Sequence, residues 1–377
     1  MLTNKIYKYF SWEIFKTFLI ILFAFTSIAW TVRSVSFLDL IIEDGYSTQT
    51  YALFSLLNIS NIITKFIPLS FLISLVISIL KFQRQSELLV LWTSGVNKKS
   101  IVNLFFFIAV IILFIQLFLA TLVTPYALNK SRNIIKTSSM DSLSSIIKSN
   151  DFTDTFSDLT FYVEKKNLNN EMENIFIRDE SNVFKDITSS PQESVNTTIL
   201  ANKGIFINKK LTLFDGLIQT QDLNGKIENI RFEKTELSLE SLHTRTTKVP
   251  KIQETATSYL FKCLKRKSFV NEEKLKCTKK ETNMEHISRR VGMPLYIPLI
   301  SLICSFLLIT AKRKKNIFLK KYTYFLISFI ILVLAELLVR YSGFSNTNTI
   351  LYFLIPILLL PFVYFILLNK ITNEKLR

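Results

Sequence analysis

Six runs of about 20 mostly apolar residues alternate with polar segments along this chain. They are Ile14–Val32, Ile59–Leu80, Ile101–Val123, Val291–Ala311, Tyr322–Val339 and Ile350–Leu368. The apolar core of a bilayer is about 30 Å thick, and a helix of about 20 residues crosses it. A buried helix of a soluble domain is rarely apolar on every side for this length, so we predict six transmembrane helices. The first run is too long for a cleaved signal peptide, and no small-residue cleavage site follows it.

The charged residues predict the orientation of these helices. The chain has 46 Lys and Arg against 29 Asp and Glu, a net charge of +17. The basic residues gather near both termini and in the loops Lys81–Ser100 and Lys312–Lys321. Because cytoplasmic loops carry an excess of Lys and Arg, we expect both termini in the cytoplasm and the long polar block outside. The charges flank the runs without forming one stripe, so we predict no nucleic-acid partner.

The polar block, residues 126–289, has the pattern of a β domain with helical ends. Tyr126–Ser149 lacks Gly and Pro and continues the third run as a helix, and a helix-compatible stretch runs from Glu254 to about Glu285. Partly alternating apolar segments separated by turn formers predict strands at Leu159–Lys165, Glu173–Asp179, Thr197–Asn208, Leu211–Gln221 and Ile227–Leu239. Crossover helices are missing, so we expect one antiparallel sheet of five to seven strands, curled or sandwiched.

We therefore predict an α-helical membrane protein with an inserted β domain. Its three parts are an N-terminal transmembrane domain (residues 1–125), the external domain (126–289) and a C-terminal transmembrane domain (290–377). Three helices precede the β domain, and three follow it.

Sequence motifs for catalysis are absent. Neither G-x-x-x-x-G-K-[ST] nor G-x-G-x-x-G occurs, and His243 and His286 form no zinc pattern with the three cysteines. We expect a non-catalytic chain without metal or cofactor, for which a partner would hydrolyse ATP. Cys263 and Cys277 either close a short disulfide loop or stay free thiols, and Cys304 is an apolar filler.

The loop between the second and third runs, KFQRQSELLVLWTSGVNKKS, predicts a short amphipathic helix. We expect Ser86 to cap this helix and Gly95 to end it. Its apolar face comprises Leu88, Leu89, Leu91 and Trp92. Such a helix either lies in the lipid interface or inserts into a groove of a cytosolic partner. The acidic Glu87 favours the second reading, because an anionic leaflet repels it.

Three stretches resemble the LptF/LptG permease family, the paired membrane subunits of the lipopolysaccharide exporter. Ser86–Ile101 is similar to the family signature SEL-x-x-(M/L)-x-A-(S/C)-G, except at Trp92 and Thr93, where small residues are usual. Asn4–Phe25 resembles the basic interfacial start of the family. EHISRRVGMPLYIPLISLI resembles the entry to the fourth span, in a form closer to the LptF member. The resemblance covers the whole chain.

The resemblance implies a permease subunit of an ABC transporter in the inner membrane of a Gram-negative bacterium. Such a subunit extracts lipopolysaccharide and passes it to a periplasmic bridge for outer-membrane assembly. The implied partners are a second LptF/LptG-type permease, a cytosolic LptB-like ATPase dimer and an LptC/LptA-like bridge protein. The alternatives are a permease for another lipid or a lipoprotein, whose members usually have four spans, and a membrane receptor with a periplasmic β sensor domain.

The resemblance also implies a β-jellyroll with an apolar groove in the periplasm. Phe161, Val163, Phe176, Phe206, Phe214 and Phe232 are candidates to line it, although most apolar strand residues only fill a core.

Site roles follow from the same resemblance. It implies ATPase coupling by Glu87, Leu88, Leu89, Leu91 and Gly95.

Lipopolysaccharide binding is expected from Arg33, Lys65 and Arg340. Arg33 holds a lipid phosphate or anchors the helix at the interface, and Lys65 binds phosphate or snorkels. Glu336 and Arg340, four residues apart, are expected to form a structural ion pair, with a role of Arg340 at the lipid gate as the alternative.

Overall fold

The computed structural model describes residues 5–42, 46–141, 149–156, 159–167, 171–180, 194–207, 210–222, 227–238, 251–265, 280–309 and 314–375. The chain divides into two compact units. The helical unit comprises Met1–Val32, Asn58–Asn129 and Lys251–Arg377, and the sheet unit comprises Arg33–Leu57 and Lys130–Pro250.

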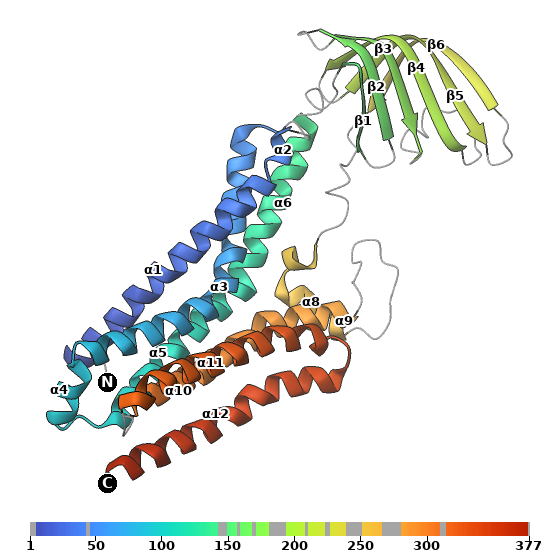
Figure 1. Ribbon diagram of the computed structural model, residues 1–377. Helices are drawn as coiled ribbons and strands as arrows, with labels where there is room; N and C mark the ends of the chain where they lie inside the picture. The colour runs from blue at the N-terminus through green and yellow to red at the C-terminus, as the bar shows by residue number, and fades with distance from the viewer. Residues whose placement is uncertain are drawn as a thin grey trace. The chain divides into compact units, whose positions relative to one another are not determined.

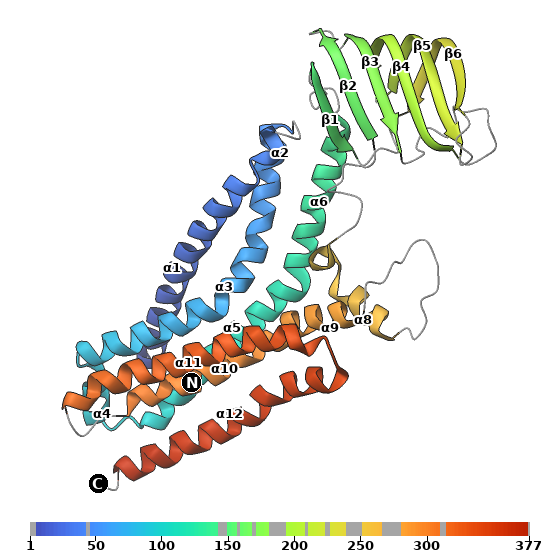
Figure 2. The same cartoon turned by 45° about the vertical axis from the view of Figure 1, so that its right-hand side comes forward.

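Long helices dominate the chain (Figures 1 and 2). The α-helices are α1 (Lys5–Ser36), α2 (Asp39–Ile42), α3 (Thr48–Arg84), α4 (Glu87–Thr93), α5 (Lys98–Phe118), α6 (Thr124–Asp141), α8 (Thr257–Lys265), α9 (Lys280–Ile287), α10 (Tyr296–Ser305), α11 (Lys314–Ser342) and α12 (Asn346–Lys375). Two π-helical segments, η1 (Leu119–Val123) and η4 (Ser288–Gly292), and three 3-10 segments, η3 (Ile252–Glu254), η5 (Met293–Leu295) and η6 (Phe306–Leu308), complete the helical structure.

Six helical stretches of the described chain are long and apolar enough to cross a membrane, which confirms the predicted number. They are Lys5–Ile42, Thr48–Arg84, Lys98–Lys136, Lys280–Leu308, Tyr322–Ser342 and Asn346–Asn373. The expected helical continuation of the third run is α6, and the expected helical stretch before the fourth run contains α8 and α9.

The centre of the helical unit is α10, whose ten residues are all buried. Its neighbours in contact are α5, α11 and α12. Small residues such as Ser301, Cys304 and Ser305 let these helices approach closely, as is common between membrane helices. In contrast, α11 and α12 present large apolar side chains outward, including Leu337, Leu358 and Phe362, as lipid-facing helices do.

The sheet unit contains one antiparallel sheet in the order β1-β2-β3-β4-β5-β6, so every strand pairs with its neighbour in sequence. The strands are β1 (Asp151–Phe156), β2 (Leu159–Lys166), β3 (Glu171–Asp179), β4 (Ser194–Ile207), β5 (Lys210–Asp222) and β6 (Ile227–Ser238). The antiparallel sheet and its strand number are confirmed, and β1 is the strand that the sequence analysis missed.

The register puts apolar side chains on one face of this curved sheet. Phe161 pairs with Ile177, Ile177 with Ile199, and Ile199 with Ile218, and all four side chains are buried in one apolar cluster. Because side chains alternate between faces along a strand, the intervening polar residues point the other way. The described strands thus form a single up-and-down sheet with one apolar face.

Candidate functional site: the loop helix and an intramembrane charge cluster

The two ends of the loop helix α4 differ in whether they have the predicted cap. Ser86 has a φ of 60°, in the left-handed region, and its side chain makes no capping hydrogen bond. The predicted Ser86 cap is therefore wrong, because a capping serine needs an extended backbone to aim its hydroxyl at the first turn. Gly95 does terminate the helix, with a φ of 83°. The amides of Gly95 and Val96 donate to the carbonyls of Trp92 and Leu91, the two bonds of a Schellman motif.

The apolar side chains of α4 point in two directions. Leu88 and Leu91 are only 4% and 6% exposed and belong to the core of the helical unit. Leu89 and Val90 are 61% and 63% exposed. Of the apolar face expected from the sequence, Leu88 and Leu91 hold α4 in place, whereas Leu89 points outward beside Val90, which was not assigned to that face. Trp92 is half-buried against the same core.

Glu87 lies at the first turn of α4 and contacts the first transmembrane helix. The Tyr9 hydroxyl of α1 donates a hydrogen bond to Glu87 Oε1 at 3.1 Å. The second oxygen, Oε2, is buried and has no hydrogen-bond partner among the described residues. The carboxylate of Glu87 is thus held against α1 through one of its two oxygens.

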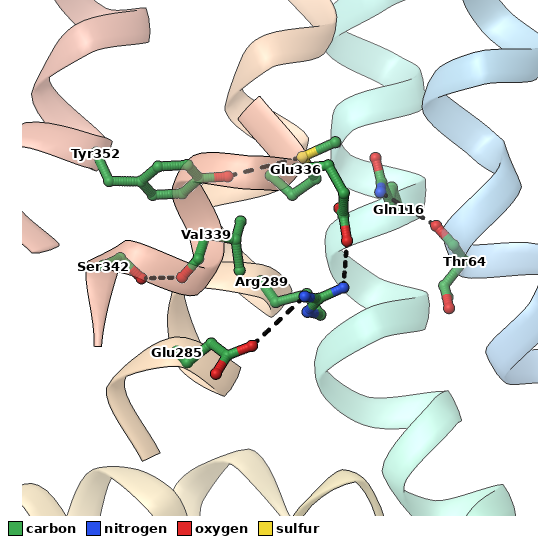
Figure 3. Close-up of polar contacts among 9 residues, drawn as sticks. Thr64, Gln116, Glu285, Arg289, Glu336, Val339, Ser342 and Tyr352 are labelled. Carbon is green, nitrogen blue, oxygen red and sulfur yellow. Dashed lines mark hydrogen bonds and ion pairs between the residues drawn. The ribbon is translucent and has the colours of Figure 1, made fainter. Parts of the chain in front are cut away.

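A charge cluster joins the beginning of the fourth span to the fifth (Figure 3). Arg289 of η4 forms an ion pair with Glu285 of α9 at 3.5 Å and a second one with Glu336 of α11. The predicted pair of Glu336 with Arg340 is wrong, because Arg289 reaches Glu336 from another helix. Arg340 itself is exposed and makes no ion pair within the described part of the chain.

The other predicted lipid-binding residues lie on separate helices. Lys65 is exposed on α3 and interacts electrostatically with His286 of α9. Arg33 is exposed near the end of α1, with its guanidinium carbon 6.0 Å from the centre of the Phe37 ring. Arg33 belongs to the sheet unit, whereas Lys65 and Arg340 belong to the helical unit.

Arg290 is a buried residue to which the sequence analysis assigned no role, although it belongs to the quoted stretch EHISRRVGMPLYIPLISLI. Its guanidinium donates to the Thr257 hydroxyl at 2.8 Å and to the carbonyls of Ile252, Gln253 and Thr255 at 2.9 to 3.1 Å. Only an arginine offers donors in this fork arrangement. Arg290 thus fastens the segment that precedes α8 to the start of the fourth span.

A second missed residue, Gln116, compensates for a proline. Pro68 lies inside α3 and has no amide hydrogen, so the carbonyl of Thr64 loses its helical donor. Gln116 of α5 is 4% exposed and donates from Nε2 to this carbonyl at 3.2 Å (Figure 3). A proline within one apolar run and a glutamine within another are visible signals, but their pairing depends on tertiary structure.

Several other expectations depend on individual side chains. Cys304 is a buried free thiol. Cys263 is disulfide-bonded. Cys277 lies outside the described residues, so its pairing with Cys263 stays a prediction. His243 also lies outside the described residues. The part of the chain that the structure describes contains no group of three or more potential metal ligands.

The candidate groove residues of the sheet fall into two main groups, those buried in the apolar cluster and those that line a cavity. Phe161 and Val163 are fully buried in the apolar cluster. Phe176 and Phe232 line an open cavity of about 870 Å³. Phe214 is half-buried, and the side chain of Phe206 is outside the described part.

Six candidate spans in two groups of three, with an antiparallel sheet inserted between them, are the architecture of a multi-pass membrane protein. The sequence profile of the family described as "Lipopolysaccharide export system permease LptF/LptG" matches residues 8–370. The chain belongs to this family. It is also 24% identical over 294 residues to "Uncharacterized protein RP871" of Rickettsia prowazekii (strain Madrid E), a match that covers 77% of each chain.

Proposed function

We propose that this chain is one permease subunit of an ABC exporter that extracts lipopolysaccharide from the inner membrane. The observation that carries the proposal is the family match over nearly the whole length of a six-span chain with an inserted sheet. In this proposal, residues 1–125 and 290–377 are the transmembrane domains, both termini are cytoplasmic, and residues 126–289 lie in the periplasm. Of the two family members, we infer that this chain corresponds to LptF.

The proposed partners supply what the chain lacks. A second LptF/LptG-type permease completes an apolar lipid cavity between the transmembrane helices, and an LptB-like ATPase dimer hydrolyses ATP. A periplasmic LptC/LptA-like bridge receives the lipid. The sheet unit is the exit domain for the acyl chains in this proposal, and the open cavity lined by Phe176 and Phe232 is the candidate surface that they contact.

The ATPase docks on α4 in this proposal. Leu89 and Val90 face outward and contact the ATPase groove, while Leu88 and Leu91 hold the helix from within. Glu87, which is partly exposed at the first turn of α4, is the acidic contact to the ATPase. Gly95 shapes the exit from the helix.

Lipid phosphates bind to exposed basic side chains. Arg33, Lys65 and Arg340 fill this role, and arginine can bind phosphate with two parallel hydrogen bonds. Because Glu336 pairs with Arg289, the Arg340 guanidinium is not neutralised by the acid on its own helix. Lipid enters laterally between α1 of one subunit and α11 of the other, and closure of the ATPase dimer squeezes it from the cavity.

Depletion of the chain in its native bacterium tests the proposal. Lipopolysaccharide then accumulates in the inner-membrane fraction, and re-expression restores its distribution. An unchanged distribution after depletion would contradict lipopolysaccharide export. If another lipid or a lipoprotein accumulates in its place, the alternative permease function is correct.

A further inference from the structure

The first turns of α1 contact the end of α3 and the loop helix through two polar pairs. Tyr9 and Glu13 are four residues apart, so they share one face of α1. The Tyr9 hydroxyl donates to Glu87 of α4 at 3.1 Å. Glu13 forms an ion pair with Lys81, in the last turn of α3. One face of α1 therefore holds both sides of the α3–α4 corner.

Apolar packing supports the same contact beside the polar pairs. Phe10 is 3% exposed, and its ring centre lies 4.3 Å from that of Phe82, a fully buried residue of α3. One helical turn further on, Ile14 is completely buried. Close aromatic pairs of this kind add to the stability of a buried contact. The beginning of α1 is thus packed firmly against α3.

Among the described residues, the hydrogen bond from Tyr9 is the directional side-chain contact between α4 and α1. Along the rest of α4, Thr93 and Ser94 donate to carbonyls of α4 itself, and Leu88 and Leu91 contribute non-directional apolar packing. Tyr9 is about half exposed, so its burial alone does not explain a tyrosine there. A hydroxyl that donates to Glu87 Oε1 does explain it, because this hydrogen bond fixes the orientation of the carboxylate.

From this arrangement we propose that Tyr9 is a positioning residue that transmits motion of the loop helix to the first span. Tyr9 orients Glu87 for the ATPase and ties α4 to α1, so that displacement of α4 moves α1. The inference rests on the proposed function, because it takes Glu87 as the coupling acid. It goes further in naming the span that receives the motion and the hydroxyl that connects the two helices.

The test uses the complete complex in lipid nanodiscs or proteoliposomes, with both permeases and the ATPase. Two quantities are measured: ATP turnover, and lipopolysaccharide released to a soluble acceptor. The variant Tyr9→Phe keeps the ring and removes the donor. Tyr7→Phe is the matched control, because Tyr7 lies on the same helix and packs against the core, and its hydroxyl has no hydrogen bond within the described residues.

The expected result is a loss of coupling without a loss of assembly. Tyr9→Phe retains the ATPase and changes ATP turnover less than about 2-fold, but lowers lipid released per ATP by about 3- to 10-fold. Tyr7→Phe behaves like the wild type. The double variant Tyr9→Phe/Glu87→Leu is no worse than Glu87→Leu alone, because leucine has no acceptor and both changes remove the same hydrogen bond.

Contrary results separate the inference from the proposed function. If wild-type complex releases lipopolysaccharide and Tyr9→Phe releases as much per ATP, the positioning role of Tyr9 is wrong and the proposed function stands. Additive losses in the double variant would also overturn it. If the wild-type complex hydrolyses no ATP and releases no lipopolysaccharide, the proposed function fails first, and the role of Tyr9 fails with it.

Discussion

Pro68 and Gln116 form a pair in which one residue creates a gap in backbone hydrogen bonding and the other fills it. The carbonyl of Thr64 sits four residues before the proline, where a helical amide would normally donate. Gln116 donates to it from the neighbouring helix α5. Within a membrane, no bulk water is available to replace such a donor.

Gln116→Leu is expected to destabilise the protein by about 1 kcal/mol, because the carbonyl of Thr64 then has no donor. The same change in a Pro68→Ala background is expected to cost clearly less, because the new amide at position 68 restores the helical hydrogen bond. Thermal unfolding of the four forms in detergent measures the difference. Equal losses in both backgrounds would mean that Gln116 acts in some other way.

Arg289 and Glu336 offer a second test at this scale. Arg289→Ala strands the Glu336 carboxylate on a membrane helix, and we expect a loss of about 2–3 kcal/mol. The double variant Arg289→Ala/Glu336→Ala is expected to recover the part of that stability that belongs to Glu336, because no carboxylate remains there, while Glu285 loses its partner in both variants. Arg340→Ala is the control, because Arg340 is exposed and leaves no acid behind. A double variant as unstable as Arg289→Ala would contradict the ion pair.

Residue-level predictions from the sequence had mixed results even for local chemistry: Gly95 ends α4 as predicted, but Ser86 does not cap it. Glu336 and Arg340 have the spacing of a helical ion pair, yet the partner of Glu336 is 47 residues away in sequence. Arg290 and Gln116 likewise bind backbone carbonyls that only the tertiary structure brings near. A sequence pattern carries no information about such contacts.

At the scale of single elements, the end of α4 depends on the conformation of Gly95. A Cβ at Gly95 would meet no atom within 4 Å, so a substitution there is disfavoured only by its φ of +83°. Gly95→Ala is expected to cost about 1 kcal/mol, whereas Gly95→Asn costs less because asparagine tolerates the left-handed region better. Hydrogen exchange of the amides at positions 95 and 96, measured in the full chain, reports how far their hydrogen bonds at the end of α4 are weakened. Identical exchange in all three forms would argue against a Schellman motif.

The sheet contains two glycines that differ in what surrounds them. A Cβ at Gly216 would lie 2.2 Å from the backbone oxygen of Leu200 and 2.4 Å from the Phe232 ring. At Gly204 the nearest atom, at 2.3 Å, is the movable end of the Ile175 side chain. We expect Gly216→Ala to cost at least about 3 kcal/mol and Gly204→Ala less, since a backbone oxygen cannot move aside. Limited proteolysis of the sheet unit ranks the two, and the reverse order would contradict the described register.

The elements themselves were largely predictable. The six spans follow from a length and polarity that a bilayer imposes on any crossing helix, and five strands follow from alternation and turn residues. The missed strand β1, DFTDTF, carries two aspartates, residue types that are depleted in strands. It forms because β2 provides an antiparallel edge for it.

For the whole molecule, the order of three spans, a sheet and three spans was predictable, because each part leaves its own signature in the sequence. The contacts that join parts of the helical unit were not predictable. Examples are Tyr9 with Glu87 and Arg290 with the segment before α8. They involve residues 33 to 78 positions apart, and each alone is an ordinary polar residue. In the proposed function, partner proteins supply ATP hydrolysis and receive the lipid.

Affinity purification of the tagged full chain in mild detergent, with mass spectrometry of bound proteins and lipids, tests the central claim most directly. The account predicts a second six-span permease, a soluble ATPase and lipopolysaccharide in the eluate. Glu87→Arg, which reverses the charge at the proposed docking point, is expected to lose the ATPase while keeping the second permease. A lone chain, or one bound to signalling proteins without lipid, would contradict the exporter and favour a membrane receptor.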